Sequence, residues 1–120
     1  MRKTARDFEA LVEQALAQLP ACYRARLRNL LFVVEDEPRE AGLLGLYEGR
    51  PLTERIGGEP AMLPDRITIY QRPHERACRS ERELRAMVAE TVWHEVGHYF
   101  GMDERQTLRA ERRRARRPRL

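Results

Sequence analysis

Two histidines and a glutamate on one short stretch of the chain are the residue types of a zinc hydrolase. Residues 94–98 read His-Glu-Val-Gly-His, which is the pattern His-Glu-x-x-His. Because a helix turns once in about 3.6 residues, His94 and His98 project from one face and can bind the same Zn²⁺. Glu95 can then act as the general base that takes a proton from a zinc-bound water. The spacing predicts a zinc-dependent hydrolase that cleaves peptide (amide) bonds.

A catalytic zinc site needs a third protein ligand, because zinc is four-coordinate and one position is left for water. Gly101 lets the chain turn sharply, so that the acidic residues after it can swing back toward the metal. Glu104 lies ten residues after His94 and occupies the last position of His-Glu-x-x-His-x-x-Gly-x-x-X. We favour Glu104 as the third ligand over Asp103, and Glu111 is a weaker candidate.

The reaction also calls for a hydrogen-bond donor to the developing oxyanion. Tyr47, Tyr70 and His74 are candidate donors, and the sequence does not choose among them. We favour a loop position without a catalytic role for His74, and a place on the surface of a strand for Tyr70. Trp93 reads as a core residue rather than as a substrate contact.

A helix that begins at a capping box is expected to position the histidines. Ser80 and Glu83 have the spacing of an N-cap serine and its partner glutamate, and an apolar run follows them. We expect the helix to continue to about Phe100, where Gly101 supplies the left-handed residue that ends it. In helical projection the apolar residues form a broad arc that does not include the two histidines.

The remaining elements predict an α+β fold without internal repeats. The continuous apolar run at 30–34 is typical of a buried strand, and the alternation at 66–70 is typical of a half-buried one. In chain order we expect helices at 7–19 and 21–27, strands at 30–34, 43–47 and 66–70, the long helix, and a last helix after Asp103.

Length and composition fit one globular domain. The chain has 120 residues, of which 42% are hydrophobic and 35% are charged. No signal peptide or bilayer-spanning apolar stretch is recognised, so a cytoplasmic protein without a membrane partner is the expectation. Cys22 and Cys78 are too few for a disulfide scaffold and are expected to be free thiols.

The basic residues are concentrated at the C-terminal end. Residues 105–120 hold eight Arg and one Glu, whereas residues 1–104 hold fifteen basic and eighteen acidic residues. We therefore separate a domain at 1–108 from an Arg-rich tail at 109–120. A solvated tail is the favoured interpretation, and binding to nucleic acid or to an acidic protein is an alternative.

The chain resembles the minimal zincin-like metallopeptidases of bacteria over roughly residues 7–108. The resemblance rests on the segments 32–38 (FVVEDEP), 44–49 (LGLYEG), 64–67 (PDRI) and 92–101 (VWHEVGHYFG). It implies a reduced zincin-like fold, in which a small mixed sheet packs on the active-site helix and the N-terminal helices. It also implies that His94 and His98 bind Zn²⁺ with an acidic third ligand near Glu104.

These features together predict a zinc metallopeptidase that acts on peptide or protein substrates, with His94, His98 and Glu104 as ligands and Glu95 as the base. Two other functions compete with this one. The first is a noncatalytic zinc-binding domain that mediates an interaction. The second is a nucleic-acid-associated protein that acts through its basic tail.

Overall fold

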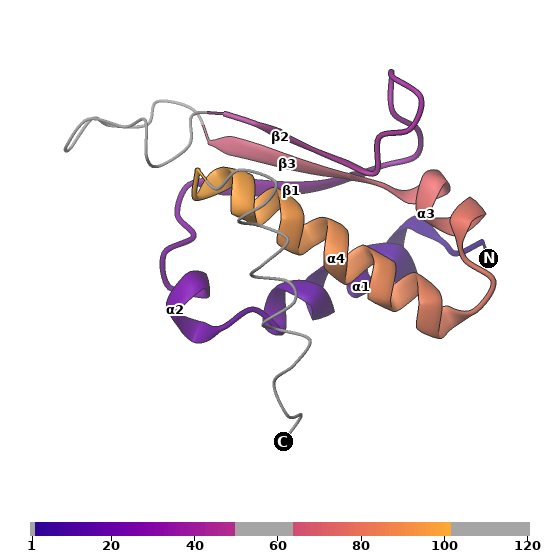
Figure 1. Cartoon of the computed structure of the whole chain (residues 1–120), viewed down its shortest axis with the longest axis horizontal. Helices are drawn as coiled ribbons and strands as arrows, with labels where there is room; N and C mark the ends of the chain where they lie inside the picture. Colours follow the sequence, from indigo (N-terminus) through magenta and orange to yellow (C-terminus); the bar gives the residue numbers. More distant parts are fainter. Residues whose placement is uncertain (1, 50–63, 102–120) are drawn as a thin grey trace.

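The computed structural model describes residues 2–49 and 64–101 (Figure 1). Its elements in chain order are α1 (Ala5–Ala17), α2 (Ala21–Arg24), β1 (Leu30–Glu35), β2 (Gly45–Glu48), β3 (Asp65–Tyr70), α3 (Gln71–Ala77) and α4 (Glu81–Tyr99). This combination of helices with a small mixed sheet confirms the predicted α+β class. The expected last helix and the boundary at residue 108 lie outside the described residues.

The three strands form one sheet in the order β1-β3-β2. β1 runs parallel to β3, and β2 runs antiparallel to β3 with Leu46 opposite Thr68. The prediction of a half-buried strand at 66–70 was wrong, because β3 is the central strand: Thr68 is 1% exposed although its side chain faces away from the helices. The strand predicted to be buried at 30–34 is only partly buried on the face toward the helices, and on the other face Leu31 is 50% exposed.

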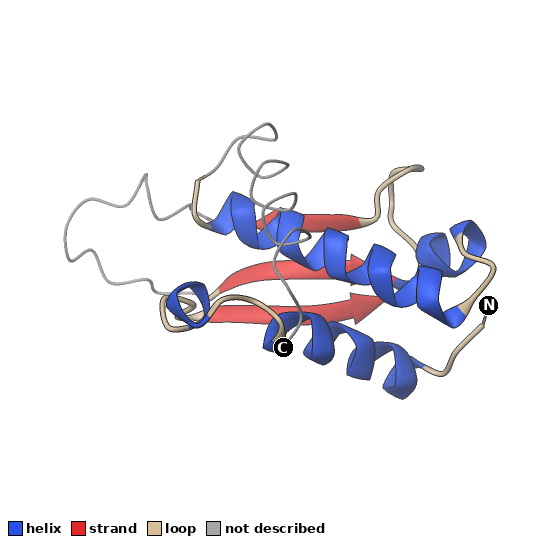
Figure 2. Ribbon diagram, turned by 60° about the horizontal axis from the view of Figure 1, so that its bottom comes forward, coloured by secondary structure: helices blue, strands red, loops and turns tan. Residues whose placement is uncertain are grey.

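Two helices cover one face of the sheet (Figure 2). α4 packs on β2 and β3, whereas α1 packs on β1 and on α4. Their contact surfaces supply most of the hydrophobic core, which includes Phe8, Leu11, Val12, Ile67, Ile69, Leu84, Val88, Val92 and Val96. Within the described part of the chain, no helix has the length and apolar content needed to cross a lipid bilayer.

The first two helices differ slightly from their predicted bounds. α1 begins earlier than predicted because the Thr4 hydroxyl caps it, accepting a hydrogen bond from the Asp7 N–H at 3.1 Å. It ends at Ala17, two residues before its predicted end. Leu19 is nevertheless buried, so the apolar pattern continues past the end of the helix. α2 ends at Arg24, three residues before its predicted end.

α4 is held at both ends, and its prediction is confirmed. The Ser80 hydroxyl accepts a hydrogen bond from the Glu83 N–H at 3.1 Å. At the other end Gly101 has a φ of 79°, as expected for the residue that terminates a helix. The buried Tyr99 hydroxyl lies 3.2 Å from the Arg28 backbone nitrogen and 3.0 Å from its carbonyl oxygen, which ties this end of α4 to the segment before β1.

α3 was not predicted, and it corrects the interpretation of His74 as a loop histidine. The short helix has no side-chain N-cap, and Pro73 lies in its first turn, so its sequence carries little helical signal. Tertiary contacts hold it in place: the Arg72 N–H donates to the Asp36 carbonyl oxygen at 3.0 Å. His74 is consequently a helical residue with no exposed surface.

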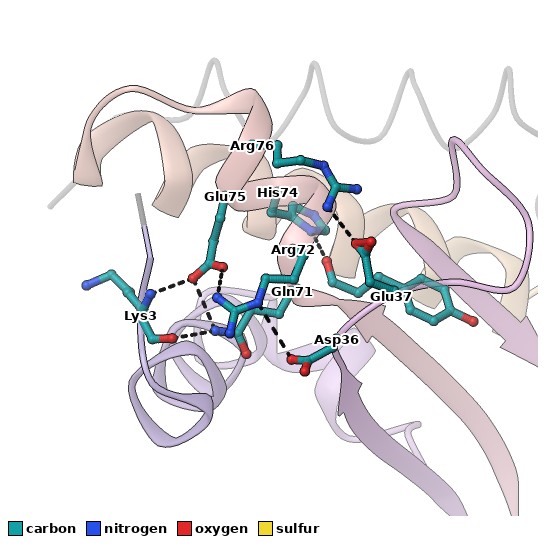
Figure 3. A network of polar contacts seen from close by, with 9 residues as sticks. Lys3, Asp36, Glu37, Gln71, Arg72, His74, Glu75 and Arg76 are labelled. Atoms are coloured by element: carbon teal, nitrogen blue, oxygen red, sulfur yellow. Dashed lines mark hydrogen bonds and ion pairs between the residues drawn. The ribbon is translucent and has the colours of Figure 1, made fainter.

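A network of polar contacts joins α3 to the N-terminal segment and to the end of β1 (Figure 3). At its centre is Glu75, which is only 3% exposed. The Glu75 carboxylate accepts hydrogen bonds from the Lys3 N–H at 2.6 Å, from Gln71 Nε2 at 3.1 Å and from Arg72 Nη1 at 2.6 Å. Burial alone would raise the pKa of Glu75, but these hydrogen bonds outweigh it and hold the pKa below its usual value.

Replacing Glu75 should therefore destabilise the fold strongly. We expect Glu75→Ala to lower the free energy of unfolding by roughly 2–4 kcal/mol, because it leaves buried donors without an acceptor. Chemical denaturation measures this change. The matched control is Glu81→Ala, because Glu81 also binds Lys3, through Nζ at 2.6 Å, but on the surface. Equal losses of unfolding free energy in the two variants would show that the buried network stabilises the fold no more than the surface ion pair does.

Candidate metal centre and groove

The two histidines of the motif meet on the exposed side of α4. Their Nε2 atoms lie 3.1 Å apart, and their ring centroids are 4.8 Å apart. Both residues are half-buried, so that solvent reaches the pair. The helix thus brings the His94 and His98 side chains to one point, as predicted.

This separation fits a shared zinc ion. Two nitrogens bound to tetrahedral Zn²⁺ at about 2.0–2.1 Å lie roughly 3.3 Å apart, close to the spacing of the two imidazoles. In residues 2–49 and 64–101, no third His, Cys, Asp or Glu joins the pair to form a three-residue cluster. The predicted third ligand Glu104 and its alternatives Asp103 and Glu111 lie outside the described residues.

Glu95 lies against β2 rather than in solvent. The residue is 7% exposed, and its side chain lies next to Gly45 of the strand. Burial raises the pKa of Glu95 to about 7, although a hydrogen bond from the Tyr47 backbone N–H opposes the shift. A carboxyl group with a pKa near neutrality is suited to taking up and returning a proton at physiological pH.

The lack of a side chain at Gly45 allows β2 to approach α4 this closely. A Cβ atom at this position would lie 2.8 Å from Thr91 Cγ2 and 3.0 Å from Glu95 Cγ. Both distances are shorter than normal van der Waals contact, so alanine would push the strand and the helix apart. Gly45 was not singled out from the sequence, although an isolated glycine in a strand is a known sign of close backbone approach.

The outer edge of β2 faces the same side as Glu95. The Tyr70 N–H donates to the Leu44 carbonyl oxygen at 3.0 Å, and Leu46 pairs with Thr68. Since hydrogen-bonded pairs alternate along an antiparallel ladder, the backbone groups of Gly45 and Tyr47 point outward. The Tyr47 N–H that binds Glu95 is one of these outward groups.

A groove of about 370 Å³ lies between α4 and the start of β2. One wall is the segment from Gly42 to Gly45. The other wall is a strip along α4 that consists of Met87, Glu90, Thr91, His94 and Glu95. The groove therefore brings an apolar surface up to the first histidine and the buried carboxylate.

The three candidate oxyanion donors do not line this groove. The Tyr47 hydroxyl donates to Asp65 Oδ2 at 2.6 Å. Tyr70 is 6% exposed, so its assignment to the strand surface was wrong, and both ring nitrogens of His74 have hydrogen-bond partners. Trp93 is a core residue, as predicted, and packs edge-on against Tyr23.

The cysteines play no part in the site. Cys22 is exposed, Cys78 is buried, and both are free thiols, as predicted. The Sγ atom of Cys78 lies 3.5 Å from the Met87 sulfur. The Arg-rich tail at 109–120 lies outside the described residues.

Comparison with known proteins supplies a family for this arrangement. The family model described as "Zincin-like metallopeptidase" matches residues 27–114, which is more than half of the chain. The match includes β1, the groove, α3 and all of α4. No curated protein matches the chain.

Zinc affinity tests the paired histidines. We expect His94→Ala and His98→Ala each to weaken zinc binding by more than about 100-fold, since even loss of an outer partner costs roughly 10- to 100-fold. Isothermal titration with Zn²⁺ measures the affinity. His74→Gln is the matched control, because it changes the third histidine and should bind zinc normally. Wild-type affinity in either motif variant would contradict the assignment.

The stability of the protein should depend on pH through His74. Burial lowers the pKa of His74, and the hydrogen bond to the Tyr70 carbonyl only partly opposes this. The unfolded chain then binds more protons than the folded chain between the two pKa values, so stability falls as pH drops below about 6.5. Chemical denaturation at several pH values between about 5 and 8, the range in which histidine titrates, measures this loss of unfolding free energy.

The curve of unfolding free energy against pH should be flatter for His74→Gln than for the wild type, because the variant lacks this titrating group. The other two histidines remain in both proteins and do not contribute to the difference. Parallel curves for the wild type and the variant would show that His74 contributes no pH dependence.

Proposed function

The chain belongs to the zincin-like metallopeptidase family, and from this premise we propose that it is a zinc-dependent peptidase with Glu95 as its general base. His94 and His98 would hold the metal through Nε2. The third ligand in the proposal is Glu104, with Asp103 as the alternative. A zinc ion at this position supplies a Lewis acid that polarises the scissile carbonyl and lowers the pKa of a water molecule.

The observation that carries the proposal is the position of the Glu95 carboxylate. It is buried beside a half-buried pair of imidazoles and is held by the Tyr47 N–H, in the wall of a groove that reaches His94. If this site only bound metal, a buried carboxylate beside the two histidines would not be needed. Glu95 therefore takes the proton of the attacking water at its carboxylate and delivers it to the nitrogen of the leaving amine.

The substrate in this proposal is an extended peptide that pairs with the outer edge of β2. The outward backbone groups of Gly45 and the Tyr47 carbonyl would form strand-like hydrogen bonds with it. The apolar groove wall at Leu43, Leu44 and Met87 would contact a substrate side chain. Pairing along β2 brings a peptide bond next to Glu95, because the same strand donates the Tyr47 N–H to that residue.

Hydrolysis of a broad peptide library by the zinc-loaded protein tests the proposed function. We expect Glu95→Gln to lower the rate by about 10²- to 10⁴-fold, which is the usual contribution of a general base. Product analysis by mass spectrometry gives both the rate and the cleaved bonds. Glu13→Gln on α1 is the matched control, because Glu13 is exposed and far along the chain from the groove.

Equal hydrolysis by the wild type and by Glu95→Gln would contradict the role of Glu95. Tight zinc binding with no hydrolysis of any peptide would instead favour the noncatalytic zinc-binding domain. Zinc analysis of each sample belongs with the assay, so that loss of metal is not mistaken for loss of the base.

A further inference from the structure

A buried series of hydrogen bonds leads from α3 to the groove and ends next to Glu95. His74 has no exposed surface, its Nδ1 lies 2.6 Å from the Tyr70 carbonyl oxygen, and its Nε2 lies 2.8 Å from Thr91 Oγ1. A carbonyl oxygen can only accept, so Nδ1 carries a proton. In the neutral ring that burial favours, Nε2 is then an acceptor, and the Thr91 hydroxyl donates to it.

This hydrogen bond selects one orientation of the Thr91 side chain. Threonine in a helix has two common χ1 rotamers, because its hydroxyl can also bond a carbonyl of the preceding turn. Thr91 Oγ1 lies 2.8 Å from His74 Nε2 and donates also to the Met87 carbonyl oxygen at 3.1 Å, so its single proton is shared between two acceptors that favour the same rotamer. With Oγ1 held there, the Thr91 methyl group faces Gly45, where a Cβ would lie 2.8 Å from it.

The Thr91 methyl group and the Glu95 side chain flank the same point of β2. A Cβ on Gly45 would lie 3.0 Å from Glu95 Cγ and 3.2 Å from Glu95 Oε2. Another rotamer would turn the hydroxyl or the hydrogen of Thr91 toward β2 in place of the methyl group and would leave this close contact unfilled. The orientation of Thr91 therefore affects the distance between β2 and Glu95, and with it the hydrogen bond from the Tyr47 N–H.

The position of His74 is itself fixed from outside the groove. Ion pairs join α3 to the residues just after β1: Arg76 Nη1 lies 2.7 Å from Glu37 Oε1, and Arg72 Nε lies 3.9 Å from Asp36 Oδ1 (Figure 3). The buried Glu75 joins the same helix to the N-terminal segment. On its other side the His74 ring contacts Phe8 of α1, with centroids 5.8 Å apart.

We propose that His74 is a positioning residue that holds the Glu95 carboxylate at the edge of β2 by fixing the rotamer of Thr91. His74 does not touch substrate or metal in this proposal. The catalytic consequence rests on the proposed function, because it assumes that Glu95 is the base. The structural consequence does not depend on that assumption. It is that the Tyr47 N–H stays hydrogen-bonded to Glu95.

Thr91→Val tests the proposal, because it removes the hydroxyl and keeps the size of the side chain. The first measurement is hydrogen exchange of the Tyr47 amide by NMR in the metal-free protein. We expect exchange about tenfold faster than in the wild type, the loss expected for one hydrogen bond to an ionisable group. The second measurement is hydrolysis by the zinc-loaded protein, in which kcat should fall about tenfold with KM unchanged.

The matched control is Thr68→Val, the same change at another buried threonine. Thr68 pairs with Leu46, next to Tyr47, but its side chain lies on the face of the sheet opposite α4. We expect this control to leave the Tyr47 amide unchanged. Equal acceleration in Thr68→Val and Thr91→Val would overturn the proposal, because general loosening of the sheet would then explain both results.

A pair of substitutions at His74 gives the second test. His74→Gln keeps an acceptor for the Thr91 hydroxyl, whereas His74→Phe keeps a flat ring but has no acceptor. We expect Tyr47 amide exchange to remain close to wild type in His74→Gln and to become about tenfold faster in His74→Phe. The unfolding free energy of each variant shows whether a difference in overall stability accounts for the change.

Different results test the positioning role of His74 and the proposed function. Unchanged Tyr47 exchange in both Thr91→Val and His74→Phe would show that His74 does not position Glu95. If the wild-type protein hydrolyses no peptide, the proposed function fails, and the exchange measurements still decide whether His74 and Thr91 hold Glu95 against β2.

Discussion

The candidate site depends on the close packing of β2 against α4 at Gly45. The strand can approach because residue 45 has no side chain, and the approach buries Glu95 beside the Tyr47 N–H. The same contact forms one wall of the groove that reaches His94. The burial of the Glu95 carboxyl group and the position of the groove beside the two imidazoles are thus consequences of one tight contact.

The rest of the fold holds the two partners of this contact in register. α4 is fixed by the Ser80 cap at one end and by the buried Tyr99 hydroxyl at the other. β2 is fixed through β3, whose central position links it to β1 and to the core beneath α1. α3 follows β3 directly and carries His74 to the back of the site. Each wall of the groove therefore belongs to an element that is anchored elsewhere in the fold.

The parts of the site that could be predicted are those encoded in local spacing. The N-cap at Ser80, the terminating Gly101 and the convergence of His94 and His98 each depend on short spacings along one helix, although the Glu83 carboxylate accepts from the Arg79 N–H and not from Ser80. The burial of Glu95 and the role of Gly45 depend on a contact between distant segments, which spacing does not reveal. The helical position of His74 and its contact with Thr91 could not be predicted for the same reason, since α3 has no helical signature and is held by tertiary contacts. The central position of β3 likewise made a strand with an alternating pattern buried on both faces.

The central claim is that His94 and His98 form the metal centre while Glu95 remains free of the metal to handle a proton. A crystal structure of the zinc-loaded protein, with anomalous diffraction measured at the zinc edge, tests it most directly. We predict one zinc peak at about 2.0–2.1 Å from Nε2 of both histidines, with Glu95 hydrogen-bonded to the Tyr47 N–H and outside the coordination shell. A zinc ion bound by Glu95, or no zinc between the two imidazoles, would contradict the account.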